Sequence, residues 1–170
     1  MKLKLFLRSL GDTEKFGMIL GKNCRQGDVI LLTGTLGAGK TKLTQFIAKG
    51  LQVPSDSYIT SPSFSLMNQY FGRMPLYHID CYRLEGEDDV EDSGIIDYIV
   101  ADGLTVIEWP ERLGSLRPDD RLDIELTSGR NEERYVTVTA HGKGWQKRFN
   151  VLKKKLLDAA LGPGEKIVEK

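Results

Sequence analysis

The chain has 170 residues, of which 40% are hydrophobic, and its 24 basic and 24 acidic residues give a formal net charge of zero. This length and composition predict one compact domain and exclude an intrinsically disordered chain. A neutral chain has no bulk positive field that would bind it whole to nucleic acid or to an anionic membrane. Its two cysteines are too few for a disulfide framework, and no apolar run approaches the ~20 residues of a membrane-spanning helix. We therefore expect a cytoplasmic protein with no membrane partner.

The first fifty residues predict two strands and two helices. In residues 2–8, three leucines alternate with Lys2, Lys4 and Phe6, which is typical of a strand with one buried face. Cap chemistry followed by apolar residues at helical spacing predicts a helix that ends near Asn23. The continuous apolar run at 29–32 is typical of a strand buried on both faces, and the pattern at 40–50 predicts an amphipathic helix.

The rest of the chain begins with a polar segment at 54–63 that holds two prolines and six hydroxyl side chains. This composition predicts a long loop, and long loops in compact domains are often functional. We then expect strands at 64–71 and 76–84, an acidic loop or helix start at 85–91, a short helix at 95–101, a strand at 104–109, paired antiparallel strands at 122–126 and 135–139, and a basic amphipathic helix at 145–160. No repeat or linker is found, so we predict one domain at 1–161 and a flexible tail at 162–170.

A glycine-rich segment matches the phosphate-binding motif GxxxxGK[ST] at every fixed position. Its residues are Gly34, Thr35, Leu36, Gly37, Ala38, Gly39, Lys40 and Thr41. Glycines let the backbone curl so that N–H groups point at phosphate oxygens, and the helix that follows adds its positive N-terminal end. Lys40 can reach the β- and γ-phosphates, and the Thr41 hydroxyl can ligate magnesium. Because the segment lies between a predicted buried strand and a predicted helix, it indicates a site for a magnesium-bound nucleoside triphosphate.

Two carboxylates follow apolar strand residues, where an unpaired charge is costly unless a cation meets it. They are Asp80 and Glu108, and both fit the carboxyl ends of strands, where open α/β sheets bind ligands. The alternative for each is a surface carboxylate without a role. His78 shares the strand face of Asp80, and we expect it to be a hydrogen-bonded structural histidine. Trp109 is more typical of a packing residue than of a nucleotide platform.

Several classes of protein use such a loop, and the residues alone exclude only some of these classes. The chain has no NKxD sequence for guanine, and the segment after Asp80 lacks the glycine of a DxxG motif, so a GTPase loses support. A small-molecule kinase usually needs an arginine-bearing lid, and no spacing of the arginines after residue 110 identifies one.

Four segments in this order resemble the motifs of the TsaE (YjeE) family, which are bacterial ATPases needed to make threonylcarbamoyladenosine in tRNA. The segments are 34–41, 61–66, 77–84 and 106–111. The resemblance implies a P-loop α/β fold, with a mixed sheet, flanking helices and antiparallel additions. It also implies ATP hydrolysis in association with the TsaB–TsaD pair that transfers the threonylcarbamoyl group, so that tRNA is reached only indirectly, through that complex.

The resemblance also assigns roles to single residues. Lys40 binds phosphate, Thr41 and Glu108 hold magnesium, and Asp80 is the acidic residue after the second motif strand. Further members of the nucleotide site are the other residues of the loop, with Lys42 after it and Thr13, which matches a family threonine near the nucleotide.

A further set of residues is implied to respond to the nucleotide or to a partner. The segment with Ser61, Ser63 and Ser65 resembles a switch loop that senses the nucleotide. Trp109 shares the motif of the second carboxylate and is placed at the partner surface. The family usually has threonine at both later serines, aspartate at Thr35 and threonine at residue 42, so the charge beside the loop differs here.

The predicted reaction is attack of water in line with the γ-phosphate of ATP. Lys40, backbone amides at 37–41 and magnesium would stabilise the developing charge. Asp80 or Glu108 would orient or deprotonate the water, and the sequence does not apportion these two roles. We expect slow turnover alone and faster turnover with a partner. The alternatives are a small-molecule kinase and a nucleotide-sensing binding module with negligible catalysis.

Overall fold

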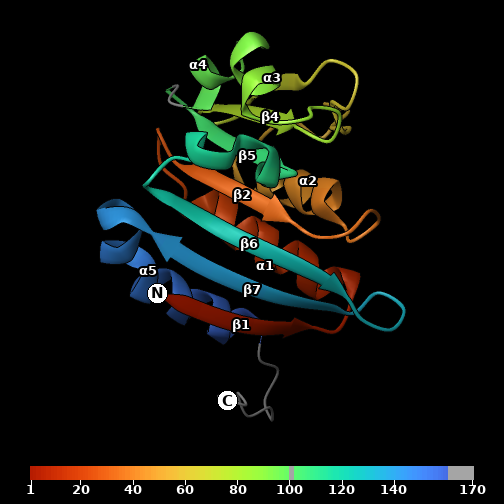
Figure 1. Ribbon diagram of the computed structural model, residues 1–170. Coiled ribbons are helices and arrows are strands. Elements are labelled where there is room, and N and C mark those ends of the chain that lie inside the picture. Colours follow the sequence, from red (N-terminus) through yellow and green to blue (C-terminus); the bar gives the residue numbers. More distant parts are fainter. Residues whose placement is uncertain (100–101, 161–170) are drawn as a thin grey trace.

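The computed structural model describes residues 1–99 and 102–160, which form one α/β domain around a seven-stranded mixed sheet (Figure 1). The strand order is β1-β7-β6-β2-β5-β4-β3. The strands are β1 Lys2–Leu7, β2 Val29–Thr33, β3 Met67–Phe71, β4 Pro75–Asp80, β5 Leu104–Glu108, β6 Arg121–Ser128 and β7 Arg134–His141. The helices are α1 Leu10–Asn23, α2 Lys40–Gly50, α3 Glu87–Asp92, α4 Ile96–Ile99, the 3-10 helix η1 Pro110–Leu116 and α5 Gly142–Ala160. The predicted fold class is confirmed, and the predicted tail at 162–170 lies outside the described residues.

The centre of the sheet is parallel. Strand β2 pairs in parallel with β5 on one side and with β6 on the other, and β5 pairs in parallel with β4. The register sets Leu32 beside Glu108, and Glu108 beside Asp80. Because the carboxyl ends of parallel strands meet at one edge, these two carboxylates become neighbours.

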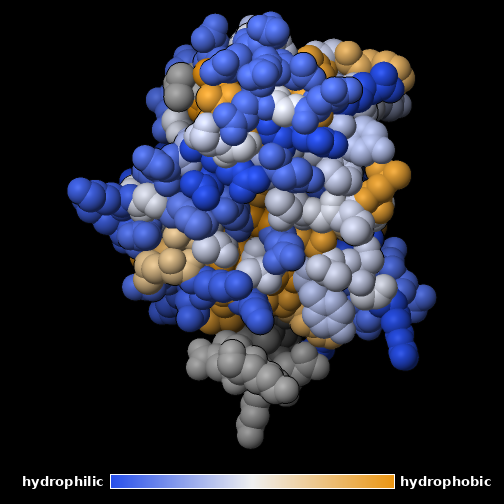
Figure 2. Space-filling view, in the orientation of Figure 1, coloured by the Kyte–Doolittle hydropathy of each residue, from blue (hydrophilic) through white to orange (hydrophobic). Residues whose placement is uncertain are grey.

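The antiparallel additions lie at both edges of the sheet. Strand β7 pairs antiparallel with β6 and β1, and β3 pairs antiparallel with β4. Side chains of β1 and β7 alternate between buried and more exposed positions, as the period of two requires. The face of the molecule turned to the viewer in Figure 1 carries mostly hydrophilic residues (Figure 2).

Helices cover the two faces of the sheet in different ways. Helices α1, α2 and α5 contribute to the larger apolar cluster, which includes residues of all the strands except β3. Helices α3, α4 and η1 contribute to a smaller cluster over β2, β4 and β5. The strands that hold the two carboxylates therefore have apolar packing on both sides. None of the helices in the described part of the chain combines the length and apolarity needed to cross a bilayer.

Several expected boundaries are corrected by turns and caps. The strand expected at 64–71 begins only at Met67, because Leu66 adopts a left-handed φ of 64° and its N–H bonds the Pro62 carbonyl. The strand expected at 76–84 ends at Asp80, whose side chain accepts a hydrogen bond from the backbone of Tyr82. The strand expected at 104–109 stops at Glu108, one residue before a left-handed turn.

The remaining differences concern helices. The acidic stretch forms α3, and the helix expected at 95–101 is observed as α4, with residues 100–101 outside the described chain. Helix α5 begins three residues earlier than predicted. The Asp120 carboxylate accepts hydrogen bonds from the N–H groups of Gly144 and Trp145, which satisfies donors of the first turn.

Candidate functional site

The glycine-rich loop lies between β2 and α2, in the strand–loop–helix context that the sequence predicts. Its backbone needs glycine at two places in particular. Gly39 precedes α2 with a left-handed φ of 101°. Gly34 has a φ of 147°, and a Cβ there would lie 2.5 Å from the carbonyl oxygen of Leu126. The loop can therefore curl against β6 only with glycine at this position.

A pocket of about 460 Å³ opens beside this loop at the carboxyl edge of the sheet. It brings together the glycine-rich loop, the start of α2, the polar loop before β3 and the ends of β4 and β5. Its lining residues are Leu36, Gly37, Gly39, Lys40, Thr41, Lys42, Ser61, Ser63, Asp80, Tyr82, Arg83, Glu108 and Trp109. Most of the site residues predicted from the sequence therefore line one cavity.

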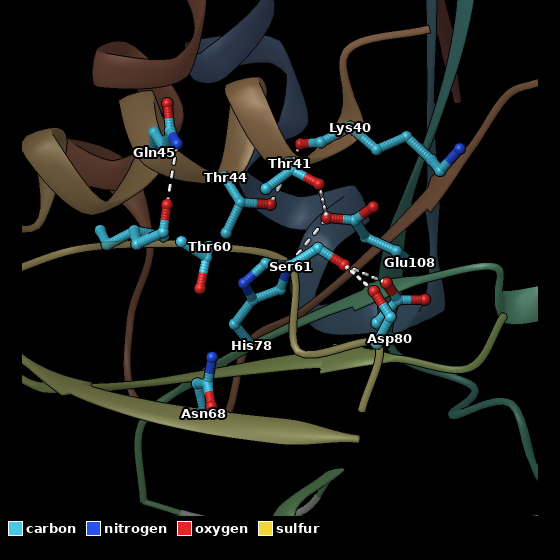
Figure 3. Close-up of polar contacts among 12 residues, drawn as sticks. Lys40, Thr41, Thr44, Gln45, Thr60, Ser61, Asn68, His78, Asp80 and Glu108 are labelled. Atoms are coloured by element: carbon cyan, nitrogen blue, oxygen red, sulfur yellow. Dashed lines mark hydrogen bonds and ion pairs between the residues drawn. The ribbon is translucent and has the colours of Figure 1, made fainter. Parts of the chain in front are cut away.

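Glu108 at the end of β5 is held by two neighbours (Figure 3). The Thr41 hydroxyl donates to Glu108 Oε1 at 2.9 Å, and His78 Nε2 lies 2.8 Å from the same oxygen. Both Glu108 and His78 are buried. The carboxylate and the threonine hydroxyl thus form a pair of hard oxygen ligands at the base of the pocket, which is the donor chemistry that magnesium prefers.

Asp80 at the end of β4 is tied to the polar loop. The Ser61 hydroxyl donates to Asp80 Oδ2, and Ser61 Oγ lies 2.8 Å from Ser63 Oγ. Asp80 Oδ1 accepts from the N–H of Tyr82 at 3.0 Å. The loop predicted to act as a switch therefore contacts one of the two carboxylates through Ser61, which is itself in contact with Ser63.

Lys40 lies almost fully buried along the loop, with 5% of its surface exposed. Its Nζ donates to the carbonyls of Gly34 at 2.7 Å and Thr35 at 3.1 Å, and it lies 3.9 Å from the centre of the Trp109 ring. Burial lowers the pKa of Lys40, and the nearby Glu108 carboxylate opposes that shift. In Figure 3 the side chain extends away from Glu108, and Lys40 forms part of the pocket wall.

Trp109 is half-buried and packs at the base of the pocket. Its backbone is left-handed, with φ 58° and ψ 49°, and its ring contacts Tyr82 with centroids 5.0 Å apart. Under Lys40 it contributes a cation–π contact, of the order of 0.5–2 kcal/mol. The packing role is confirmed, and the suggested role at a partner surface stays a prediction.

Some predicted residues do not line the main pocket. Thr13 lines a separate cavity of about 130 Å³ behind the loop, together with Ala38, Gly39 and Lys42. The Thr13 hydroxyl donates to the carbonyl of Ser9, the residue before α1, at 3.2 Å. Ser65 is exposed and donates to Asn68 Oδ1 at 3.1 Å, away from the two carboxylates.

Sequence reasoning missed residues that support the site from elsewhere in the chain. Arg134 at the start of β7 donates from Nε to the carbonyl of Ala38 at 2.8 Å, and so holds the loop from behind. Gln45 on α2 donates to the carbonyl of Ile59 at 2.8 Å, and so anchors the polar loop. Neither residue belongs to a recognisable motif, and no local pattern could have identified them. Tyr82 and Arg83 follow Asp80 by two and three residues and belong to the segment 77–84, but they were not assigned to the site.

The chain was compared with protein families, characterised relatives and solved structures. The family model described as threonylcarbamoyl adenosine biosynthesis protein TsaE matches residues 7–136. The tRNA threonylcarbamoyladenosine biosynthesis protein TsaE of Treponema pallidum is 39% identical over 131 residues, which are 77% of this chain and 96% of that protein. The protein of the same name from Nostoc sp. is 39% identical over 143 residues, covering 80% and 85%. The crystal structure of YdiB from Bacillus subtilis superposes with a TM-score of 0.73 and 30% identity, over 93% of this chain and 95% of that one.

Proposed function

Because the chain belongs to the TsaE family of tRNA threonylcarbamoyladenosine biosynthesis proteins, we propose that it is a cytoplasmic ATPase that supports the TsaB–TsaD threonylcarbamoyl transferase. Family membership carries the role in tRNA modification. The observation that carries the ATPase activity is the pocket in which Lys40, Thr41, Asp80 and Glu108 meet. Its volume of about 460 Å³ lies within the usual range for small-molecule sites.

Nucleotide binding is assigned to the loop and to the start of α2. Lys40 and the backbone amides at 37–41 bind the phosphate oxygens, and the N-terminal end of α2 adds a positive dipole. Thr41 and Glu108 hold magnesium through their oxygen atoms, which lie 2.9 Å apart. Bound magnesium supplies charge neutralisation on the phosphates.

Hydrolysis needs a group that orients the attacking water. Glu108 Oε1 already contacts Thr41 and His78, which favours the metal-ligand role for Glu108. Asp80 lines the same pocket from the neighbouring strand and contacts the polar loop through Ser61. We therefore assign the water-orienting role to Asp80, with Lys40 stabilising the charge that develops on the transferred phosphoryl group.

Partner activation is supported by the rim of the pocket. Three large apolar side chains from three different loops are exposed there or beside it: Leu36 at 77%, Phe64 at 86% and Tyr82 at 47%. Arg83 also lines the pocket. Its guanidinium lies over the Phe64 ring, 3.9 Å from the ring centre. We therefore expect slow turnover by the chain alone and faster turnover when TsaB–TsaD covers this rim.

The test combines calorimetry with Mg-ATP, phosphate release with and without TsaB–TsaD, and pull-down of TsaB and TsaD under ATP, ADP and no nucleotide. We expect magnesium-dependent binding, slow phosphate release and stimulation by the pair. Asp80→Asn is expected to bind Mg-ATP but to release phosphate at least about 10²-fold more slowly. Absence of binding heat from folded protein would contradict the proposal.

Two other outcomes would identify the alternatives. A phosphorylated metabolite in place of free phosphate would indicate a small-molecule kinase. Repeated rounds of tRNA modification by a non-hydrolysing Asp80→Asn protein in its ATP-bound form would indicate a nucleotide-sensing module. The contact between Ser61 and Asp80 favours the nucleotide-sensing alternative over the kinase, because it joins the polar loop directly to the pocket.

A further inference from the structure

His78 is a fully buried histidine that directly contacts a candidate metal ligand. It lies on β4 with 0% of its surface exposed, and its Nε2 is 2.8 Å from Glu108 Oε1. The same carboxylate oxygen accepts the Thr41 hydroxyl at 2.9 Å. Figure 3 shows His78, Glu108 and Thr41 as a continuous chain of contacts from the sheet to the start of α2.

The surroundings of the ring indicate which nitrogen carries the proton. His78 Nδ1 is buried and has no hydrogen-bond partner among the residues that the structure describes. An orphaned buried N–H group is rarer and costlier than an acceptor without a donor. In the neutral form of the ring, the proton therefore lies on Nε2 and is donated to Glu108 Oε1.

We propose that His78 is a positioning residue that orients Glu108 toward the magnesium-binding Thr41, an inference that rests on the proposed function. A carboxylate at the end of a strand can rotate about its side-chain torsions, and several rotamers would turn its oxygens away from Thr41. Two donors on one oxygen restrict that rotation, because both hydrogen bonds are lost when the group turns. Outer partners of metal ligands commonly change metal affinity about 10–100-fold when they are removed.

A purely structural histidine would have different consequences. Its loss would lower the stability of the fold, because His78 is fully buried beside its register partner Val106. The loss of a purely structural histidine would not change how nucleotide binding depends on magnesium. The two roles are therefore separated by comparing binding with and without the metal, together with the thermal unfolding of each variant.

The experiment uses amides that differ in reach. His78→Gln can place an N–H group near the position of Nε2, whereas His78→Asn places one only near Nδ1 and so leaves Glu108 without this donor. Calorimetry would measure ATP affinity for each full-length variant, once with excess magnesium and once with a chelator. His78→Leu provides a third variant of similar volume with no donor.

We expect His78→Asn and His78→Leu to weaken magnesium-dependent ATP binding by about 10–100-fold while metal-free binding stays within about twofold. His78→Gln should recover most of the loss. If His78→Asn or His78→Leu does not fold, the magnesium dependence of His78→Gln is compared with that of the remaining one of these two variants. Equal magnesium dependence in wild type, Asn and Gln proteins would overturn the positioning role and leave the ATPase proposal standing. A wild-type protein that binds no Mg-ATP would instead overturn both.

Discussion

The parallel and antiparallel parts of the sheet have very different surroundings. In β4 and β5 nearly every residue is buried, and the polar side chains Asp80 and Glu108 come at the carboxyl ends. In β1 only alternate residues are buried, and Lys2 and Lys4 between them are exposed. In the described part of the chain, the smaller apolar cluster includes no residue of β1, β6 or β7. The outer face of these strands therefore lacks the apolar packing that covers β4 and β5.

This difference shows how strand direction locates chemistry. Parallel strands bring all their carboxyl ends to one edge, so that carboxylates far apart in sequence meet in one pocket. Antiparallel neighbours alternate in direction, so polar groups at their ends are divided between two edges. We infer that the antiparallel part supplies stability to α1 and α5, while the parallel part supplies the site.

The largest expected effect is that of Lys40→Ala, which tests whether chemistry is confined to the parallel edge. Removing the ammonium group should slow phosphate release by about 10²–10³-fold, as for other preorganised groups that stabilise transition-state charge. The free energy of unfolding should change by less than about 1 kcal/mol, because the lost hydrogen bonds are offset by relief of a buried charge. Phosphate release and urea unfolding measure the two quantities. A large loss of stability would mean that Lys40 is a structural residue.

The second-largest expected effect is a loss of fold stability at the contact between α1, which packs on the antiparallel part, and α2, which follows the glycine-rich loop. Gly21 on α1 meets α2 so closely that a Cβ would lie 2.1 Å from the Ile47 carbonyl oxygen. Gly21→Ala gains about 1 kcal/mol of helix propensity but must push two helix backbones apart. We expect a net loss of about 1–3 kcal/mol in urea unfolding, with the ATP affinity of the folded protein nearly unchanged. A stabilised variant would show that α1 and α2 are loosely packed.

Sequence reasoning predicts strands in both parts, including the antiparallel pair β6 and β7, but it locates the site only in the parallel part. The motif at 34–41, the apolar run at 29–32 and the placement of Asp80 and Glu108 at strand ends follow from local patterns. The alignment of Asp80 with Glu108 does not, because it depends on pairing between strands that are distant in sequence. Contacts from irregular segments, such as Ser61 with Asp80, have no periodicity that could reveal them.

A smaller effect is expected at the loop that meets the parallel edge. Ser61→Ala removes the hydroxyl that bonds Asp80, so the carboxylate is less well oriented. We expect phosphate release to fall about fivefold, equivalent to about 1 kcal/mol for one hydrogen bond. Ser65→Ala is the matched control, because Ser65 is an exposed serine of the same segment that bonds Asn68 and, among the residues that the structure describes, has no hydrogen bond to Asp80. Equal effects of the two substitutions would argue that the segment acts as a whole and not through Asp80.

The smallest effect is expected on the outer face of the antiparallel part. Lys4 on β1 is exposed and lies beside Thr137 in the register with β7. Lys4→Gln should change the free energy of unfolding by less than about 0.5 kcal/mol, because exposed substitutions without specific partners rarely matter. Phosphate release by the chain alone should also be unchanged. The informative measurement is the stimulation by TsaB–TsaD: if it falls with Lys4→Gln, this face is a docking surface, and the division between a chemical half and a supporting half fails.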